Sequence, residues 1–220
     1  MKKGWLQTWK NLLFQHFEII DKEHFTKYLP KDCEFDSFDG KYYLGLVLMN
    51  MSDVRHKSME NFVWFKNYNE LNVRAYITHK GKRGVLFLSL DVDSLVSIIG
   101  ARVFYGLPYR AGKFERFANK AKVHRHSSLH FQVEYKVLTK PKCYSKDSFA
   151  FWATERYFFA NTYLGVSFMG QITHEPWQLS EARATNLDLS VLEPYDLGQR
   201  VPDVLFCKEI KVQTNALKRI

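Results

Sequence analysis

The chain has 220 residues, and 46% of them are hydrophobic, which suffices for a sizeable core and excludes a disordered polypeptide. Its formal net charge is +9, so an acidic small molecule and a polyanion such as nucleic acid are both suitable partners. The lysines and arginines are spread along the chain without forming a recognisable nucleic-acid module, which places the polyanion second.

The composition is typical of a cytoplasmic protein. No apolar run approaches the roughly 20 residues of a transmembrane helix, and the amino-terminal stretch lacks the continuous apolar core of a signal peptide. The three cysteines, Cys33, Cys143 and Cys207, are far apart and include no CxxC pair. We therefore expect reduced thiols, no zinc site, no cofactor and no membrane segment.

The first elements predicted along the chain are a strand region and a short helix. Residues 5–17 alternate loosely between apolar and polar and predict a lead-in segment to a strand. A short helix is predicted to start at Asp21 and to end at Pro30. Residues 42–51 are apolar at almost every position, which is typical of a central strand buried on both faces.

A hairpin and a long loop are predicted next. Asp39 and Gly40 separate the strand-like residues 33–36 from residues 42–51, and this pair favours a tight hairpin turn. Residues 52–69 are irregular and rich in aromatic side chains, which indicates a long loop or a lid.

Residues 71–78 alternate cleanly and predict a strand. One face is apolar, and the other carries the polar stripe Asn72, Arg74, Tyr76 and Thr78. On an open sheet this stripe meets water, whereas in a closed sheet it lines the interior, where an arginine can clamp a carboxylate. Periodicity does not decide between the two. Glu70, just before the strand, is either an acid–base group or a surface carboxylate.

Residues 91–113 predict a helix followed by a tight turn. Asp91 or Asp93 can cap the start, and apolar residues follow at helical spacing. Gly106 and Pro108 are typical of a helix end.

Tyr109 and Arg110 follow that helix end directly. A phenol and a guanidinium held there are well placed to act on a ligand. The alternative is a helix end with solvated side chains.

The last third of the chain predicts further strands at residues 129–137, 156–159, 163–173 and 204–212, with short helices at 145–153 and 180–192. His124, His126 and His130 share parity and can line one strand face as metal ligands, or they form a solvated basic face. His174 and Trp177 combine a titratable ring with a rigid aromatic turn. Together the elements predict one β-rich α+β domain spanning residues 1–220.

Six stretches in order resemble the uncharacterised YqjF-like family, which is similar to the acetoacetate decarboxylase superfamily. They are residues 5–15, residues 29–30 with 38–40, ELNVR at 70–74, GLPY at 106–109, TERY at 154–157 and HEPW at 174–177. The resemblance implies a cone-shaped, partly closed β-barrel with a few helices packed outside and a ligand cavity within. It favours the interior location for Asn72, Arg74 and Tyr76.

The chain departs from the decarboxylases at their catalytic turn. That turn reads Pro-Lys-Lys in the decarboxylases, and its first lysine forms a Schiff base with the keto acid. Here Tyr109 and Arg110 occupy the corresponding positions, and Lys113 lies three residues further on. A phenol cannot form an imine and a guanidinium is a poor nucleophile, so the family's Schiff-base decarboxylation is not expected.

These inferences lead to a protein that binds a small organic acid or carbonyl compound in the barrel, with turnover left open. Arg74 and Arg110 would hold the anionic end, and Tyr109 would act as hydrogen-bond donor or general acid. Glu70 and His174 are weaker candidates for proton transfer, and Asn72, Tyr76 and Trp177 complete the binding set. A basic polyanion-binding protein is the alternative function, and a homo-oligomer formed through Phe62, Trp64 and Phe65 is a third option.

Overall fold

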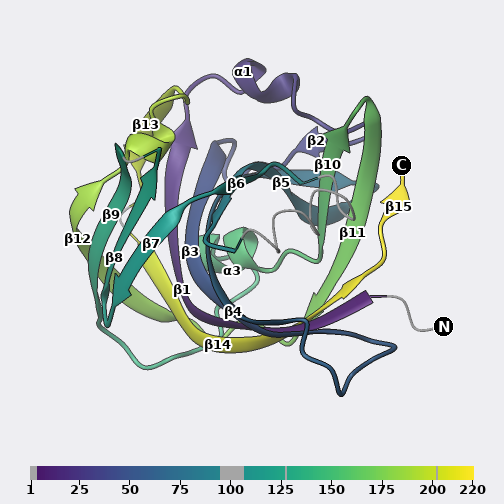
Figure 1. Ribbon diagram of the computed structural model, residues 1–220. Coiled ribbons are helices and arrows are strands. Elements are labelled where there is room, and N and C mark those ends of the chain that lie inside the picture. Colours follow the sequence, from purple (N-terminus) through teal and green to yellow (C-terminus); the bar gives the residue numbers. More distant parts are fainter. Residues whose placement is uncertain (1–3, 95–106, 127, 202) are drawn as a thin grey trace.

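The computed structural model describes residues 4–94, 107–126, 128–201 and 203–220. In this part of the chain, 15 strands join in one continuous, strongly curved sheet (Figure 1). The helices among the described residues are few and short: α1 (Glu23–Thr26), α3 (Phe149–Thr154) and the 3-10 helix η1 (Ser190–Leu192). None of the described helices is both long enough and apolar enough to cross a membrane.

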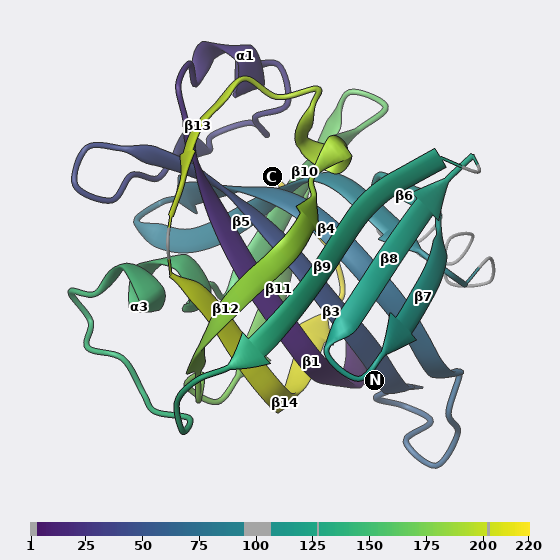
Figure 2. The same cartoon turned by 90° about the vertical axis from the view of Figure 1, so that its left-hand side faces the viewer.

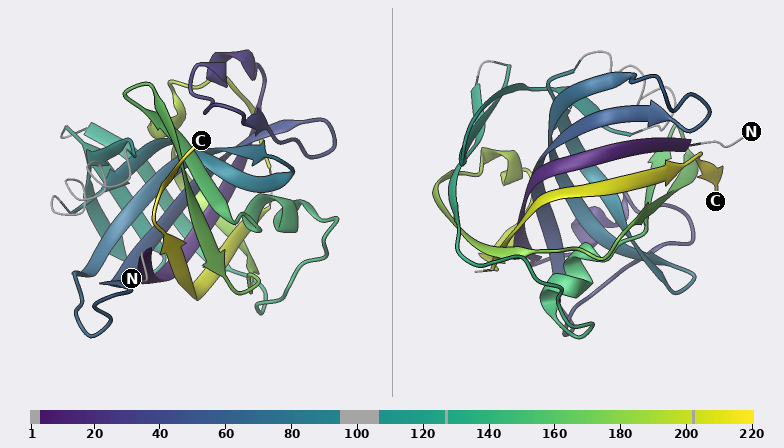
Figure 3. Two further views of the ribbon diagram at one scale, coloured as in Figure 1. Left: turned by 90° about the vertical axis from the view of Figure 1, so that its right-hand side faces the viewer. Right: turned by 90° about the horizontal axis from the view of Figure 1, so that it is seen from below.

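Seven strands close on themselves as a ring, which is seen end-on in Figure 1, and the right-hand view of Figure 3 shows the wall of this ring from below. In pairing order they are β1 (Gly4–Ile19), β3 (Tyr42–His56), β4 (Phe65–His79), β5 (Lys82–Val92), β10 (Phe158–Tyr163), β11 (Val166–His174) and β14 (Val204–Asn215). The pairing of β14 with β1 completes the ring and sets Gly4 opposite Asn215. All neighbours are antiparallel except β5 and β10.

A second layer of strands covers one side of the ring wall (Figure 2). It branches from β14 in the order β12 (Ser180–Asp188), β9 (Ser128–Val137), β8 (Lys120–Arg125) and β7 (Lys113–Phe117). Four short strands join the edges: β2 (Glu34–Phe35) pairs with β4, β6 (Tyr109–Ala111) with β5, β13 (Leu197–Arg200) with β1 and β15 (Lys218–Arg219) with β11.

The two layers create two hydrophobic cores. The inner core takes side chains from the ring strands, from β6 and from α3, including Tyr76, Tyr109 and Trp152. The outer core lies between the ring wall and the second layer, and it takes Val73 and its alternate neighbours on β4 together with Phe131 and other residues of the second layer. Side chains alternate along β4, so its predicted apolar face serves the outer core and its polar stripe faces the ring interior.

The helices occupy different places relative to the ring. Helix α1 lies outside it, as expected, whereas α3 lies at one end of the ring, within its outline (Figure 1). Ser148 caps α3, its hydroxyl oxygen accepting a hydrogen bond from the Phe151 N–H. The buried face of α3, with Ala150, Trp152 and Ala153, belongs to the inner core. This helix therefore closes one end of the interior.

Several predictions about elements of the first half need correction. Residues 5–17 form most of the long strand β1 rather than a lead-in to a strand. Residues 52–56 continue β3 and β4 begins at Phe65, so the predicted loop is much shorter. The Asp39–Gly40 turn forms, with Phe38 and Lys41 hydrogen-bonded to each other, but the preceding strand β2 pairs with β4. The turn prediction was right and the strand partner was wrong.

The helix predicted within 91–113 falls mainly on residues 95–106, which lie outside the described residues. Asp91 is not a helix cap, because it lies within β5 and its side chain is buried. Residues 180–188 form β12, not the helix expected there. The predicted strands at 129–137 and 204–212 are confirmed as β9 and β14.

Candidate functional site

Four polar residues follow one another along the inner face of β4. Glu70, Asn72, Arg74 and Tyr76 are all buried, although only Tyr76 has a largely apolar side chain. The register sets Val47 and Leu90 beside Asn72, so the stripe is flanked by apolar residues of the inner core. Burying polar groups is unfavourable unless they find hydrogen-bond partners, so the partners of each group are informative.

Glu70 is the acceptor of a buried hydrogen-bonded group. The Tyr109 hydroxyl donates to Glu70 Oε2 at 3.1 Å, and Asn72 Nδ2 donates to Oε1 at 3.0 Å. Tyr109 reaches this point because β6 pairs with β5 in parallel, with Tyr109 opposite Leu90. Burial raises the pKa of Glu70 from 4.5 to about 7, against the opposing effect of the two hydrogen bonds and Arg74. This carboxyl group therefore changes charge near neutral pH.

Arg74 lies further along the same face. Its Nη2 is 3.5 Å from the carbonyl oxygen of Ala153, and its guanidinium lies over the rings of Phe14 and Tyr76, 5.5 Å and 5.6 Å from their centroids. Within the described residues, Arg74 Nε, the Tyr76 hydroxyl and Asn72 Oδ1 are buried and have no hydrogen-bond partner. Three residues that follow one another on the inner face of β4 thus present unpaired polar atoms to the ring interior.

A glycine makes room for these side chains. Gly45 of β3 lies in register between His16 of β1 and Arg74 of β4. A Cβ atom at Gly45 would lie 2.5 Å from the Tyr76 hydroxyl oxygen and 3.2 Å from Arg74 Nε. The absence of a side chain here lets Arg74 and Tyr76 lie against the wall of the ring.

His16 belongs to the same buried group. Its side chain is fully buried, and neither ring nitrogen has a partner in the described part of the chain. Burial, together with the positive charges of Arg74 and Arg156, lowers the pKa of His16 to about 3. The imidazole is therefore neutral at physiological pH, with one nitrogen able to donate and the other to accept.

Arg156 supplies a second buried guanidinium. Its Nε donates to the carbonyl oxygen of Trp152 at 2.7 Å, and its Nη1 donates to Asp36 Oδ2 at 2.5 Å. The guanidinium lies 4.8 Å from the Tyr76 ring centroid, and its Nη2 is buried without a partner among the described residues. Burial lowers the pKa of Arg156 to about 10, so it stays charged at neutral pH.

The HEPW and TERY stretches bind each other. The Trp177 backbone N–H donates to Glu155 Oε1 at 3.0 Å, and its indole N–H donates to the carbonyl oxygen of Thr154 at 2.8 Å. Glu155 also accepts from the Tyr157 hydroxyl. His174 stacks on Tyr157 with ring centroids 4.8 Å apart. Trp177 therefore anchors a turn with its two N–H groups. Its ring packs against Phe14 and other aromatic residues of the inner core.

The structure does not bring Arg110 or Lys113 into the interior. Arg110 is exposed, because it alternates with the buried Tyr109 on β6 and faces the opposite way. The Lys113 side chain is 78% exposed, and its Nζ lies 3.5 Å from Glu115 Oε1. Arg110 is therefore not placed to hold an anion in the interior, whereas Arg156 is buried there.

The three candidate metal-binding histidines do not line one strand. Strand β8 ends at Arg125, and His126 lies in the turn that follows with a φ of 48°. His124 lies 3.9 Å from Glu115 at the surface, whereas His130 lies 3.6 Å from Asp91 in the outer core. The shared parity of the sequence was misleading because the turn breaks the register.

Sequence reasoning missed His16, Gly45 and Arg156. Gly45 had a recognisable signal, since a glycine inside an otherwise apolar strand often marks a close approach. Arg156 lies within the TERY stretch. That stretch contributed to the family resemblance, but nothing in the sequence assigned a function to the arginine. His16 offered no local signal, because its position depends on the pairing of β1 with β3.

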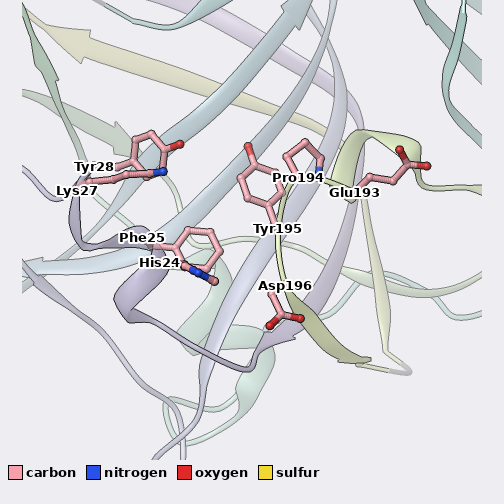
Figure 4. Close-up of a pocket in the computed structure, with 8 residues that line it drawn as sticks. All are labelled: His24, Phe25, Lys27, Tyr28, Glu193, Pro194, Tyr195 and Asp196. Carbon is pink, nitrogen blue, oxygen red and sulfur yellow. The ribbon is translucent and has the colours of Figure 1, made fainter.

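Two hollows open at the surface of the described residues, and neither is lined by the residues that carry the unpaired polar atoms on β4. The first, of about 480 Å³, lies between α1 and the segment after η1 and is lined by His24, Phe25, Lys27, Tyr28, Glu193, Pro194, Tyr195 and Asp196 (Figure 4). The second, of about 160 Å³, lies beside α3 and includes Phe149, whose ring contacts His16 edge-on at 5.1 Å. Only the second adjoins the inner group of polar residues.

Comparisons with known proteins give relatives over nearly the whole chain. Residues 6–211 match the family DUF2071, described as an uncharacterized conserved protein. The uncharacterized protein YqjF of Bacillus subtilis (strain 168) is 31% identical over 186 residues, which cover 81% of this chain and 76% of YqjF.

Solved structures give the fold. Acetoacetate decarboxylase from Legionella pneumophila has a TM-score of 0.70 at 16% identity, covering 99% of this chain and 88% of the decarboxylase chain. The enduracididine biosynthesis enzyme MppR, complexed with pyruvate, has a TM-score of 0.72 at 10% identity, covering 100% of this chain and 91% of the MppR chain. At such identities the likeness concerns the arrangement of the strands alone.

Proposed function

The chain belongs to the DUF2071 family of uncharacterized conserved proteins, as its resemblance to YqjF-like proteins predicts, and on this premise we propose that it binds a small organic acid or carbonyl compound inside its ring of strands. The fold is acetoacetate decarboxylase-like. The ligand is held without the Schiff-base lysine of the decarboxylases, since Tyr109 takes the corresponding position in the sequence.

The observation that carries this proposal is the set of unpaired polar atoms on Asn72, Arg74 and Tyr76. An unpaired buried donor or acceptor costs about 1–3 kcal/mol, and native proteins contain few of them. Three of them on successive residues of one strand face, with the His16 ring 6.0 Å from the Tyr76 ring, are best explained by a ligand that pairs with them.

Charge favours an acid as that ligand. Arg156 stays protonated in the interior, and the positive charges of Arg74 and Arg156 help to keep the nearby His16 neutral, so the inner group carries positive charge at this end. A carboxylate is the natural partner of a buried guanidinium. MppR, which shares the fold, has been crystallised with pyruvate, a small organic acid, and this supports the same ligand class here.

Glu70 and Tyr109 form the group suited to proton transfer. Their hydrogen bond is 3.1 Å long, and a carboxyl group with a pKa of about 7 can act as acid or base at neutral pH. In this proposal Arg74 holds the anionic end, and the Glu70–Tyr109 pair faces the rest of the molecule. His174, stacked on Tyr157 and bonded to the carbonyl oxygen of Glu175, is left with a structural role.

The test is calorimetric titration with a panel of 2-oxo, 2-hydroxy and unsubstituted C3 to C6 acids. Wild type should bind at least one of them, and Arg74→Met should weaken that binding at least tenfold. The control Arg183→Met removes an exposed arginine from β12 and should bind as wild type. Equal affinity of Arg74→Met and wild type would refute the assigned site.

A second measurement addresses the missing lysine. Borohydride reduction in the presence of the 2-oxo acids, followed by intact mass analysis, should leave the mass of the protein unchanged. A lysine adduct would restore imine chemistry and would contradict non-covalent binding.

A further inference from the structure

The unpaired atoms of the inner group include some that only donate and one that only accepts, and on β4 these belong to Arg74 and Asn72 respectively. Arg74 Nε and Arg156 Nη2 are groups that only donate, and both guanidinium groups lie over the Tyr76 ring, 5.6 Å and 4.8 Å from its centroid. Asn72 Oδ1 can only accept. One ligand that satisfies both kinds must offer an acceptor at one end and a donor at the other.

The orientation of the Asn72 amide follows from its neighbour. Its Nδ2 donates to Glu70 Oε1 at 3.0 Å, and Glu70 Oε2 accepts from Tyr109. With the amide nitrogen engaged by the carboxylate, the amide oxygen is the atom left for the interior. Glu70 thus fixes Asn72 as an acceptor as long as the carboxyl group is ionised.

The spacing limits the size of the ligand. Residues two apart on a strand point to the same face about 7 Å apart, so Asn72 and Arg74 can contact the two ends of a molecule with a short carbon skeleton. A hydroxyl group supplies the donor at the Asn72 end without adding another buried positive charge near Arg74 and Arg156. Both oxygens of Glu70 already accept hydrogen bonds, from Tyr109 and Asn72, so the carboxylate has partners without an ammonium group. A carbonyl oxygen at the same place would face Asn72 Oδ1, acceptor against acceptor.

Resting on the proposed function, we infer that the ligand is a small hydroxy acid, whose carboxylate binds Arg74, Tyr76 and Arg156 and whose hydroxyl group donates to Asn72 Oδ1. Neutral His16 completes the carboxylate end with one N–H donor. Asn72 is then the residue that distinguishes hydroxy acids from oxo acids and from unsubstituted acids.

The experiment uses matched triplets, such as lactate, pyruvate and propionate and their C4 to C6 homologues, titrated at pH 8, where Glu70 is ionised. Wild type should bind the hydroxy acid of a triplet at least about tenfold more tightly than the other two, because a site built to pair with a hydroxyl group rejects analogues that lack it. The affinities of Asn72→Leu for the three acids of a triplet should lie within about threefold of one another. The matched control Asn67→Leu changes an exposed residue of the same strand and should keep the wild-type preference.

The outcomes separate this inference from the proposed function. If no acid binds to wild type, the proposed function fails. If wild type binds acids but does not prefer the hydroxy member, or if folded Asn72→Leu keeps the preference, the inference fails and the proposed function stands. The wild-type triplets decide the question even if Asn72→Leu does not fold. His16→Phe should weaken all three acids alike, which places His16 at the carboxylate and not at the hydroxyl group.

Discussion

Glu70 has an environment that works against its own ionisation. It is buried on the inner face of β4, and only the hydrogen bonds from Tyr109 and Asn72 and the charge of Arg74 favour the carboxylate. Burial outweighs them, and the pKa rises to about 7. A carboxyl group is kept in such a place at a cost to stability, which is typical of functional rather than structural residues.

This cost predicts a specific pH dependence. The folded pKa of Glu70 lies above the unfolded one, so the folded state holds the proton more tightly, and stability falls as pH rises from about 4.5 to about 7. Glu70→Gln removes this titration. The free energy of unfolding of Glu70→Gln relative to wild type should therefore grow by up to about 3 kcal/mol between pH 4.5 and pH 8.

Urea unfolding at several pH values measures this difference. Glu175→Gln, which neutralises an exposed carboxylate, should run parallel to wild type over the same range. A parallel profile for Glu70→Gln would show that Glu70 is ionised throughout and has an ordinary pKa.

At the residue scale, the alternation in the sequence predicted the polar stripe on β4 but not whether it faces the interior or the solvent. Asn72, Arg74 and Tyr76 were predicted on one face of a strand, and their place in the interior followed only from the family resemblance. The structure adds His16 and Arg156, which come from distant parts of the chain. Such contacts depend on which strands pair, and no local pattern reports that.

At the scale of elements, alternation along a strand predicts well wherever the strand is regular. Residues 71–78 alternate between an apolar and a polar face as predicted, because β4 has no irregularity over that stretch except a shift in its pairing with β5. β1 was recognised only as a lead-in segment, because its register with β3 shifts between Lys10 and Leu13, where Asn11 has a φ of 50°. The β-bulge disturbs the alternation on which the prediction depends.

Helix α3 separates the inner polar group from a surface hollow. Phe149 lines that hollow on one side, and on the other its ring meets His16 edge-on at 5.1 Å. Phe149→Ala should therefore connect the hollow with His16. Since the imidazole is neutral, it reacts with diethyl pyrocarbonate as soon as the reagent reaches it.

We expect His16 to be modified about tenfold faster in Phe149→Ala than in wild type, as measured by peptide mass mapping. The exposed histidine His24 serves as an internal standard. Phe38→Ala removes a ring that packs against Phe149 at 5.4 Å and controls for loss of stability. Unchanged modification of His16 in folded Phe149→Ala, or equal acceleration in Phe38→Ala, would show that Phe149 does not block access.

At the scale of the whole molecule, the chain forms one ring and a second layer that share the strand β14. The predicted class, a β-rich acetoacetate decarboxylase-like fold, is confirmed. The second layer could not be foreseen, because its strands have the same alternation as those of the ring. The strands of the second layer differ from those of the ring in the residues they pack against across the outer core. These packing partners lie far apart in the sequence.

A buried ion pair joins the two layers in this outer core. Asp91 of β5 accepts from Arg125 of β8, with Nη2 2.6 Å from each carboxylate oxygen and Nε 3.0 Å from Oδ1. Arg125 Nη2 also donates to Ser89 Oγ at 3.2 Å, and His130 of β9 lies 3.6 Å from the carboxylate. The carboxylate is fully buried, so the hydrogen bonds and charges of its partners on the second layer must compensate for its lost hydration.

Removing one member of this pair should loosen the second layer from the ring. Asp91→Asn leaves the Arg125 guanidinium without its counter-charge, and we expect a loss of about 3 kcal/mol in the free energy of unfolding. Glu181→Gln breaks an exposed pair with Lys142 and should cost less than about 1 kcal/mol. Amide hydrogen exchange should accelerate in β8 and β9 of Asp91→Asn before it does in β3 and β4. If Asp91→Asn costs no more than Glu181→Gln, the ion pair does not hold the two layers together, and apolar packing of the outer core alone does so.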